Sequence, residues 1–357
     1  MTPRAIKSVD DLQRYLHSAM QLEHATIPPY LTALYSIRPG TNLAASQVLR
    51  TVVVEEMLHL TIAANLLNAI GGRPDLTVPG FVPRYPTGLP DGEKDFTVSL
   101  QAFSKNAIDT FLKIERPRMA PEGQPTVRVR EAAAANTPSS LGYCPVRPDM
   151  YYYSIGEFYE EIRYGFDYLF EQKDQDLFCG DEHKQITSEY YYSGGGHLEP
   201  ITNISAARES IRLITEQGEG DGGGIYDHKK ELAHFFRFQE LYLERYYQVH
   251  DTPGNPTGPA LTVDWDAVYP IKTNASLDDY KDDSELERAA IAFNDFYADF
   301  LAMLTRAYNG ERKLLFDAVP RMFQIRQLIN QLIHNPLPGA PGVNAAPTFQ
   351  IKAKVPA

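Results

Sequence analysis

The sequence predicts a mainly α-helical protein, organised as a four-helix bundle with long inserted loops and extra C-terminal helices. Apolar residues recur at helical spacing through several long segments, and Pro- and Gly-rich stretches separate them. The motif Glu-x-x-His occurs in two of the expected helices, as Glu56–His59 and Glu231–His234. Residues three positions apart project from one face of a helix, so each pair can reach the same metal ion.

Length, composition and charge limit the class of protein. A chain of 357 residues with 43% apolar and 22% charged residues is typical of a soluble globular protein with a full core. Its formal charge of −12 disfavours nucleic acid or an anionic membrane as a partner. There is no N-terminal leader pattern and no apolar run of membrane-spanning length, and the only cysteines are Cys144 and Cys179. We therefore expect a cytoplasmic protein.

The first expected bundle helix spans about residues 8–38, with Ser8 as its N-cap. Glu23 falls within the apolar stripe of this helix, where a carboxylate is costly unless it is paired or bound to a cation. Glu23 is thus a candidate ligand, and the alternative is a buried partner for a basic residue. Pro28 and Pro29 follow one turn later and are expected to interrupt or kink the helix.

The second expected bundle helix spans about residues 44–70 and ends at a Gly-Gly pair. Glu56 and His59 lie on its apolar face, whereas Glu55 lies off that face and is expected to be solvated or salt-bridged. A buried histidine alone is more often a core residue than a ligand. Glu56 at the matching offset favours the metal site.

The third expected bundle helix, about residues 154–172, offers three acids, Glu157, Glu160 and Glu161. None is central to the most apolar face of the helix. Glu157 and Glu161 flank that face, and Glu160 points further away. The pattern predicts that this helix supplies an acid, with Glu157 or Glu161 favoured over Glu160.

The fourth expected bundle helix, about residues 227–250, carries Glu231 and His234. One domain over residues 1–335 would include this bundle and two inserted excursions. Short helices are expected in both excursions, through KNAIDTFLKIERP and near Ser205 to Gln217. The two excursions cover residues 73–150 and 174–226. Further helices without a ligand motif are expected at residues 284–334, and an extended surface tail follows at residues 336–357.

Five segments resemble one known family: QLEHATIPPYLTALYS, VVVEEMLHLTIAANLLNAIGG, TFLKIERP, SIGEFYEEI and ITEQGEG. They are similar to the ferritin-like proteins related to iminophenyl-pyruvate dimer synthase, which include violacein- and rebeccamycin-pathway enzymes that couple imines of aromatic amino acids. The resemblance runs in order from about residue 8 to 335. It implies a ferritin-like four-helix bundle and favours Glu157, the glutamate after the glycine in SIGEFYEEI, as the ligand from the third helix. The implied ligand set is Glu23, Glu56, His59, Glu157, Glu231 and His234.

The function that follows is a dinuclear metal oxidoreductase of secondary metabolism. Mixed imidazole and carboxylate ligation suits iron, which we prefer, or manganese. The expected partners are a small aromatic substrate, such as an imine of an aromatic 2-oxo acid, and dioxygen or peroxide, and a homodimer is compatible with the sequence. The alternatives are ferritin-type metal storage, a peroxide activity like that of manganese catalase, and a metal-free scaffold.

Overall fold

The computed structural model describes residues 5–92, 94–118, 151–173, 177–192 and 195–351. All regular elements in these ranges are helices, joined by irregular segments with isolated β-bridges. The prediction of a mainly α protein is confirmed. Short 3₁₀ turns occur at Glu182–Lys184, Asp221–Gly223, Leu277–Tyr280 and Arg312–Leu314.

Two long helices form the centre of the bundle: α1 (Val9–Ser36) and α2 (Leu43–Ala69). Ser8 begins α1 through the expected N-cap, accepting a hydrogen bond from the Asp11 amide. The helix continues through Pro28 and Pro29 to Ser36 and is not interrupted there. By length and composition α2 could cross a membrane, but 89% of its most apolar window is buried inside the protein, as in a core helix.

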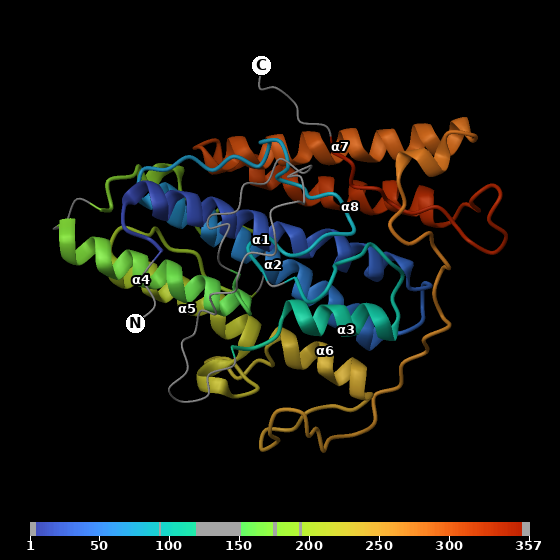
Figure 1. Cartoon of the computed structure of the whole chain (residues 1–357), viewed down its shortest axis with the longest axis horizontal. Helices are drawn as coiled ribbons and strands as arrows, with labels where there is room; N and C mark the ends of the chain where they lie inside the picture. The colour runs from blue at the N-terminus through green and yellow to red at the C-terminus, as the bar shows by residue number, and fades with distance from the viewer. Residues whose placement is uncertain (1–4, 93, 119–150, 174–176, 193–194, 352–357) are drawn as a thin grey trace.

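Shorter helices complete the bundle in two pairs. Figure 1 shows α4 (Ile155–Lys173) and α5 (Ile204–Glu219) beside one half of the long helices, and α3 (Lys105–Ile114) and α6 (His234–Leu243) beside the other half. Within each pair the helices pack against each other. The expected fourth bundle helix therefore has the wrong bounds, because α6 begins only at His234 and α5 lies beside α2 in the other half.

The C-terminal helices cover the bundle from one side. Helix α7 (Ser284–Tyr308) packs against α8 (Leu315–Ile333), and together they contact α1 and α2. From residue 334 to residue 351, the described part of the chain after α8 contains no helix or strand, but it is not confined to the surface as expected. Phe349 is 1% exposed, and its ring lies 4.9 Å from the ring of Phe293 on α7.

Candidate metal centre

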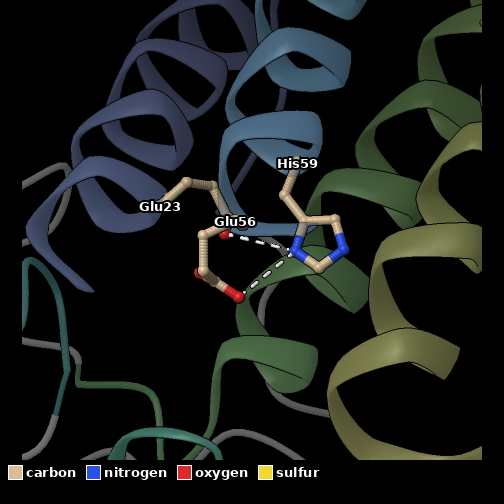
Figure 2. Close-up of side chains that lie close together, drawn as sticks. All are labelled: Glu23, Glu56 and His59. Carbon is tan, nitrogen blue, oxygen red and sulfur yellow. Dashed lines mark ion pairs between the residues drawn. The ribbon is translucent and has the colours of Figure 1, made fainter. Parts of the chain in front are cut away.

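The first group of candidate ligands lies in the middle of the two long helices. Glu23 comes from α1, and Glu56 and His59 come from α2. Figure 2 shows the Nδ1 atom of His59 facing both carboxylates, at 3.6 Å from Glu23 Oε2 and 3.6 Å from Glu56 Oε1. All three residues are buried. The helical spacing of Glu56 and His59 thus brings them together as predicted.

A second group shares Glu56 and adds Glu115 and His234. His234 Nδ1 lies 3.0 Å from Glu56 Oε1 and 3.5 Å from Glu115 Oε2. In each group the ligand atoms lie within 4.8 Å of one another. Atoms bound to one ion at about 2.0–2.2 Å are separated by about 3–4 Å, so both groups have the dimensions of a metal site. Glu56 belongs to both groups and is placed to bridge two ions.

The two candidate ligands that the second group adds to Glu56 come from helix ends. Glu115 is the C-cap of α3, and His234 is the first residue of α6. Helix α3 ends and α6 begins near the middle of α1 and α2, close to the start of α4 and the end of α5 (Figure 1). The end of α3 therefore brings the Glu115 carboxylate to Glu56, and the start of α6 brings the His234 imidazole.

The hydrogen bonds of both histidines leave Nδ1 turned toward the carboxylates. His59 Nε2 donates to Gln217 Oε1 at 2.9 Å, because the amide nitrogen of Gln217 donates to the Gly195 carbonyl at 2.6 Å. His234 Nε2 donates to Glu55 Oε2 at 2.9 Å. A histidine that binds a metal usually donates its other ring N–H to an oxygen, which sets the tautomer and the ring orientation. Both imidazoles have this arrangement.

The charges of the centre are strongly coupled. Burial raises the pKa of Glu23 to about 7, against the hydrogen bond to His59. For Glu56 burial also disfavours the charge, but hydrogen bonds to His234 and His59 outweigh it and hold the pKa below its usual range. Burial opposes a charge on His59 too, yet Glu23 and Glu56 raise its pKa to about 10. The buried carboxylates thus outnumber the two imidazoles, and a divalent cation suits this excess of negative charge.

Two buried polar atoms also fit a cation at this place. Glu23 Oε1 and His234 Nδ1 have no hydrogen-bond partner of good geometry among the described residues. An unsatisfied buried oxygen or nitrogen is costly, and such atoms often mark an ion site. The donor set of carboxylate oxygens and imidazole nitrogens suits iron or manganese.

Three hydroxyl groups surround the carboxylates. Thr26 Oγ1 donates to Glu56 Oε2 at 2.8 Å, and the Tyr30 hydroxyl donates to Glu115 Oε1. The Tyr159 hydroxyl on α4 lies near Glu23 and is buried without a hydrogen bond of ordinary geometry. Thr26 and Tyr30 therefore each hold one oxygen of a candidate ligand and leave the other oxygen toward the centre.

The structure does not bring Glu231 to the centre, in contrast to the prediction. The chain turns before α6, with an isolated bridge between Tyr226 and Leu232, so Glu231 and His234 do not share a helical turn. The Glu231 side chain is 52% exposed and lies 3.9 Å from Arg237. The second Glu-x-x-His motif has the same sequence spacing as the first, but α6 begins three residues after Glu231, so the two side chains do not share a helical face.

The acids of α4 have structural contacts instead of a place in either group. Glu157, the predicted ligand, accepts a hydrogen bond from the Tyr153 amide at 3.0 Å at the start of α4. Glu160 pairs with Arg163, and Glu161 accepts the Ala5 amide at 2.8 Å. Neither group thus includes an acid of α4, and the second group contains Glu115 of α3 instead.

The sequence prediction misses Glu115. Glu115 lies four residues after Phe111 and so continues the buried face of α3, a signal that is present in TFLKIERP. For Glu55, expected to be solvated or salt-bridged, the structure shows the second alternative, since its carboxylate is buried and pairs with His234. The sequence does not indicate this partner, which comes from the start of α6.

Two neighbouring cavities lie at and beside the centre. The first, of about 300 Å³ with its open part, is lined by four candidate ligands, Glu23, Glu56, His59 and Glu115, and by the start of α4 and the end of α5. The second, of about 290 Å³ with its open part, has an aromatic and aliphatic wall. Arg116 and Ile155 line both cavities and separate them. The wall of the second cavity includes Leu22, Phe96, Ile114, Tyr152, Tyr153 and Phe158.

Comparison with known proteins agrees with this architecture. A family model described as ferritin-like matches residues 16–243, which include all five residues of the two groups. The structure is similar to the crystal structure of a ferritin-like protein from Caulobacter vibrioides, with a TM-score of 0.61 and 22% identity over 91% of this chain and 96% of that chain. Curated proteins give no significant match. The chain belongs to the ferritin-like family.

Proposed function

We propose that the protein is a dinuclear metal oxidoreductase. The observation that carries the proposal is the pair of ligand groups joined by Glu56, each with a histidine whose Nδ1 faces the centre. Glu23, Glu56 and His59 would hold one ion, and Glu56, Glu115 and His234 the other. Iron is our first choice and manganese the second.

The metal pair would supply the redox chemistry, binding and reducing dioxygen or peroxide while electrons leave an organic substrate. The residues of the chain have other tasks. Glu55 and Gln217 hold the imidazole rings, and Thr26 and Tyr30 hold carboxylate oxygens. The burial of the five candidate ligands strengthens each of these interactions.

The aromatic wall of the second cavity favours an organic substrate over peroxide alone. Peroxide needs no apolar wall, whereas the rings of Phe96, Tyr153 and Phe158 are suited to contact with a flat aromatic molecule. We therefore propose an aromatic substrate, and the resemblance to iminophenyl-pyruvate dimer synthase suggests an imine of an aromatic 2-oxo acid. Oxidative coupling of two such imines in secondary metabolism is the specific reaction we propose.

The metal centre is tested by elemental analysis of the purified protein after reconstitution with ferrous iron or manganese. The wild-type protein should hold about two ions per chain. Glu115→Gln removes a carboxylate from one group and should lower the content to about one ion or less. Glu231→Gln is the matched control, because the same change at the exposed glutamate should leave the content unchanged.

The outcomes separate the two ligand assignments. Metal loss in Glu231→Gln with retention in Glu115→Gln would overturn the geometry described above. Absence of metal from the wild-type protein under all reconstitution conditions would overturn the proposed function.

The substrate is tested with the loaded protein by oxygen uptake in the presence of aromatic 2-imino acids, with product masses measured in parallel. Uptake that depends on the imine and yields a dimer would support oxidative coupling. Rapid peroxide breakdown without any imine-dependent uptake would instead favour the catalase-like activity.

A further inference from the structure

One wall of the first cavity faces a particular oxygen of the centre. The lining includes Glu115 as well as Thr215, Gly218 and Glu219 of α5. A Cβ atom built on Gly218 would lie 3.9 Å from Glu115 Oε2. That oxygen is the one that faces His234 Nδ1, at 3.5 Å. Position 218 thus points at the ligand atom of Glu115 and not at its other oxygen, which Tyr30 holds.

A glycine at this position is not required by the backbone. Gly218 lies in the last turn of α5, two residues before the C-cap Gly220, whose φ is 89°. In a helix, glycine is less favourable than alanine. An alanine Cβ would meet no atom of the described residues closer than 3.9 Å. Alanine would thus be more favourable than glycine for the helix at position 218, and a residue that departs from such a preference often marks a functional site.

Gly156, on the opposite wall of the same cavity, has a different reason to be glycine. A Cβ atom there would lie 2.2 Å from Glu219 Oε1, and the Gly156 amide donates to this same oxygen at 3.0 Å. Glu219 is held further by Ser154 at 2.8 Å and by Arg118 at 3.1 Å. Gly156 is thus needed for packing, whereas Gly218 leaves open space beside a ligand.

We propose that Gly218 keeps open the path by which a small exogenous ligand reaches the Glu115 side of the metal centre. The ligand class is a molecule of two or three heavy atoms with a donor atom for the metal, such as dioxygen, peroxide or azide. The proposal rests on the proposed metal centre. It assigns this cavity to the small ligand and leaves the neighbouring aromatic cavity to the organic substrate.

The test uses azide as the probe on the ferric, iron-loaded protein. Gly218→Leu places a side chain over Glu115 Oε2 and should weaken azide binding at least about tenfold, because the leucine would occupy the space that azide needs beside this oxygen. Gly218→Ala adds a smaller side chain at the same place and should weaken it by about two- to threefold. Ser205→Leu adds the same side chain to the exposed first turn of α5 and should have no effect.

Iron content and circular dichroism are measured on the same samples. Unchanged azide affinity in Gly218→Leu with normal iron content would overturn the proposal. If that variant does not fold, Gly218→Ala decides, and azide binding identical to wild type would overturn the proposal. Absence of iron from the wild-type protein would refute the metal centre itself, together with this path to it, and is distinguished by the iron content.

Discussion

The two halves of the metal centre are built in different ways. Glu23 and His59 project from the interiors of α1 and α2, long helices that are continuous and buried along most of their length. Glu115 and His234 sit at the ends of α3 and α6, helices of 10 residues each. A helix interior positions its side chains by its own geometry, whereas a helix end is positioned by the packing of loops around it. We therefore expect the first half to be preformed and the second half to depend more on the bound ions.

The surrounding hydrogen bonds show the same contrast. His59 is held by Gln217 of α5, whose amide is fixed in turn by the Gly195 carbonyl. His234 is held by a charged partner, Glu55 of α2. The short helix end thus depends on a charge-assisted bond to the long helix, which is a stronger interaction than a neutral one.

The largest effect is expected for the residue that joins the halves. Glu56→Ala removes the only carboxylate common to both groups and should abolish binding of both ions, with an affinity loss of more than about 100-fold. Elemental analysis and a ferrous iron titration measure this loss. Glu160→Ala is the control on a neighbouring helix, since Glu160 pairs with Arg163. Retention of one ion in Glu56→Ala would mean that the halves bind metal independently.

Removal of the metal should distinguish the halves without any mutation. A ligand present at about 100 times its dissociation constant stabilises a protein by about 2.7 kcal/mol, so chelation should lower the melting temperature by several degrees. Hydrogen exchange followed by mass spectrometry should then increase most in peptides that cover residues 105–116 and 225–243. Peptides from the middle of α1 and α2 should change least. Equal increases in all four helices would contradict the comparison.

The smallest effects are expected for the residues that orient the imidazoles. Glu55→Gln and Gln217→Leu each weaken the partner of one histidine and should lower metal affinity about 10- to 100-fold. We expect the larger loss of metal affinity for Glu55→Gln, because it removes the charged partner of His234, which lies at the start of the short helix α6. Competition with a chelator of known affinity measures both variants. A larger loss in Gln217→Leu would reverse the assignment of the weaker half.

The helical class and the continuous half of the centre could be predicted from the sequence. Glu23 lies in an apolar stripe, and Glu56 and His59 share a face, so a local pattern places all three on the inner side of buried helices. His234 was also predicted, but for an incorrect reason, since its supposed partner Glu231 is exposed and precedes the helix. The second Glu-x-x-His motif therefore does not predict a shared site for its two residues, because a three-residue spacing places side chains on one face only within a continuous helix.

The remaining parts depend on contacts between distant segments. Glu115 and His234 meet Glu56 only because α3 and α6 both stop beside the middle of α2, and no local pattern specifies where two helices stop relative to a third. The same holds for the partner of Glu55, because its pairing with His234 depends on where α6 begins. Phe349, in a segment expected to lie on the surface, packs against α7 for a similar reason.

The sequence alone determined the helices, the buried acids of α1 and α2, and one complete Glu-x-x-His pair, because each depends on residues within a few positions of one another. The tertiary structure decided the second half of the centre, the partners of both imidazoles and the open space at Gly218. These features depend on the packing of segments far apart in the chain. That packing is decided by the combined burial of many side chains and not by any short motif.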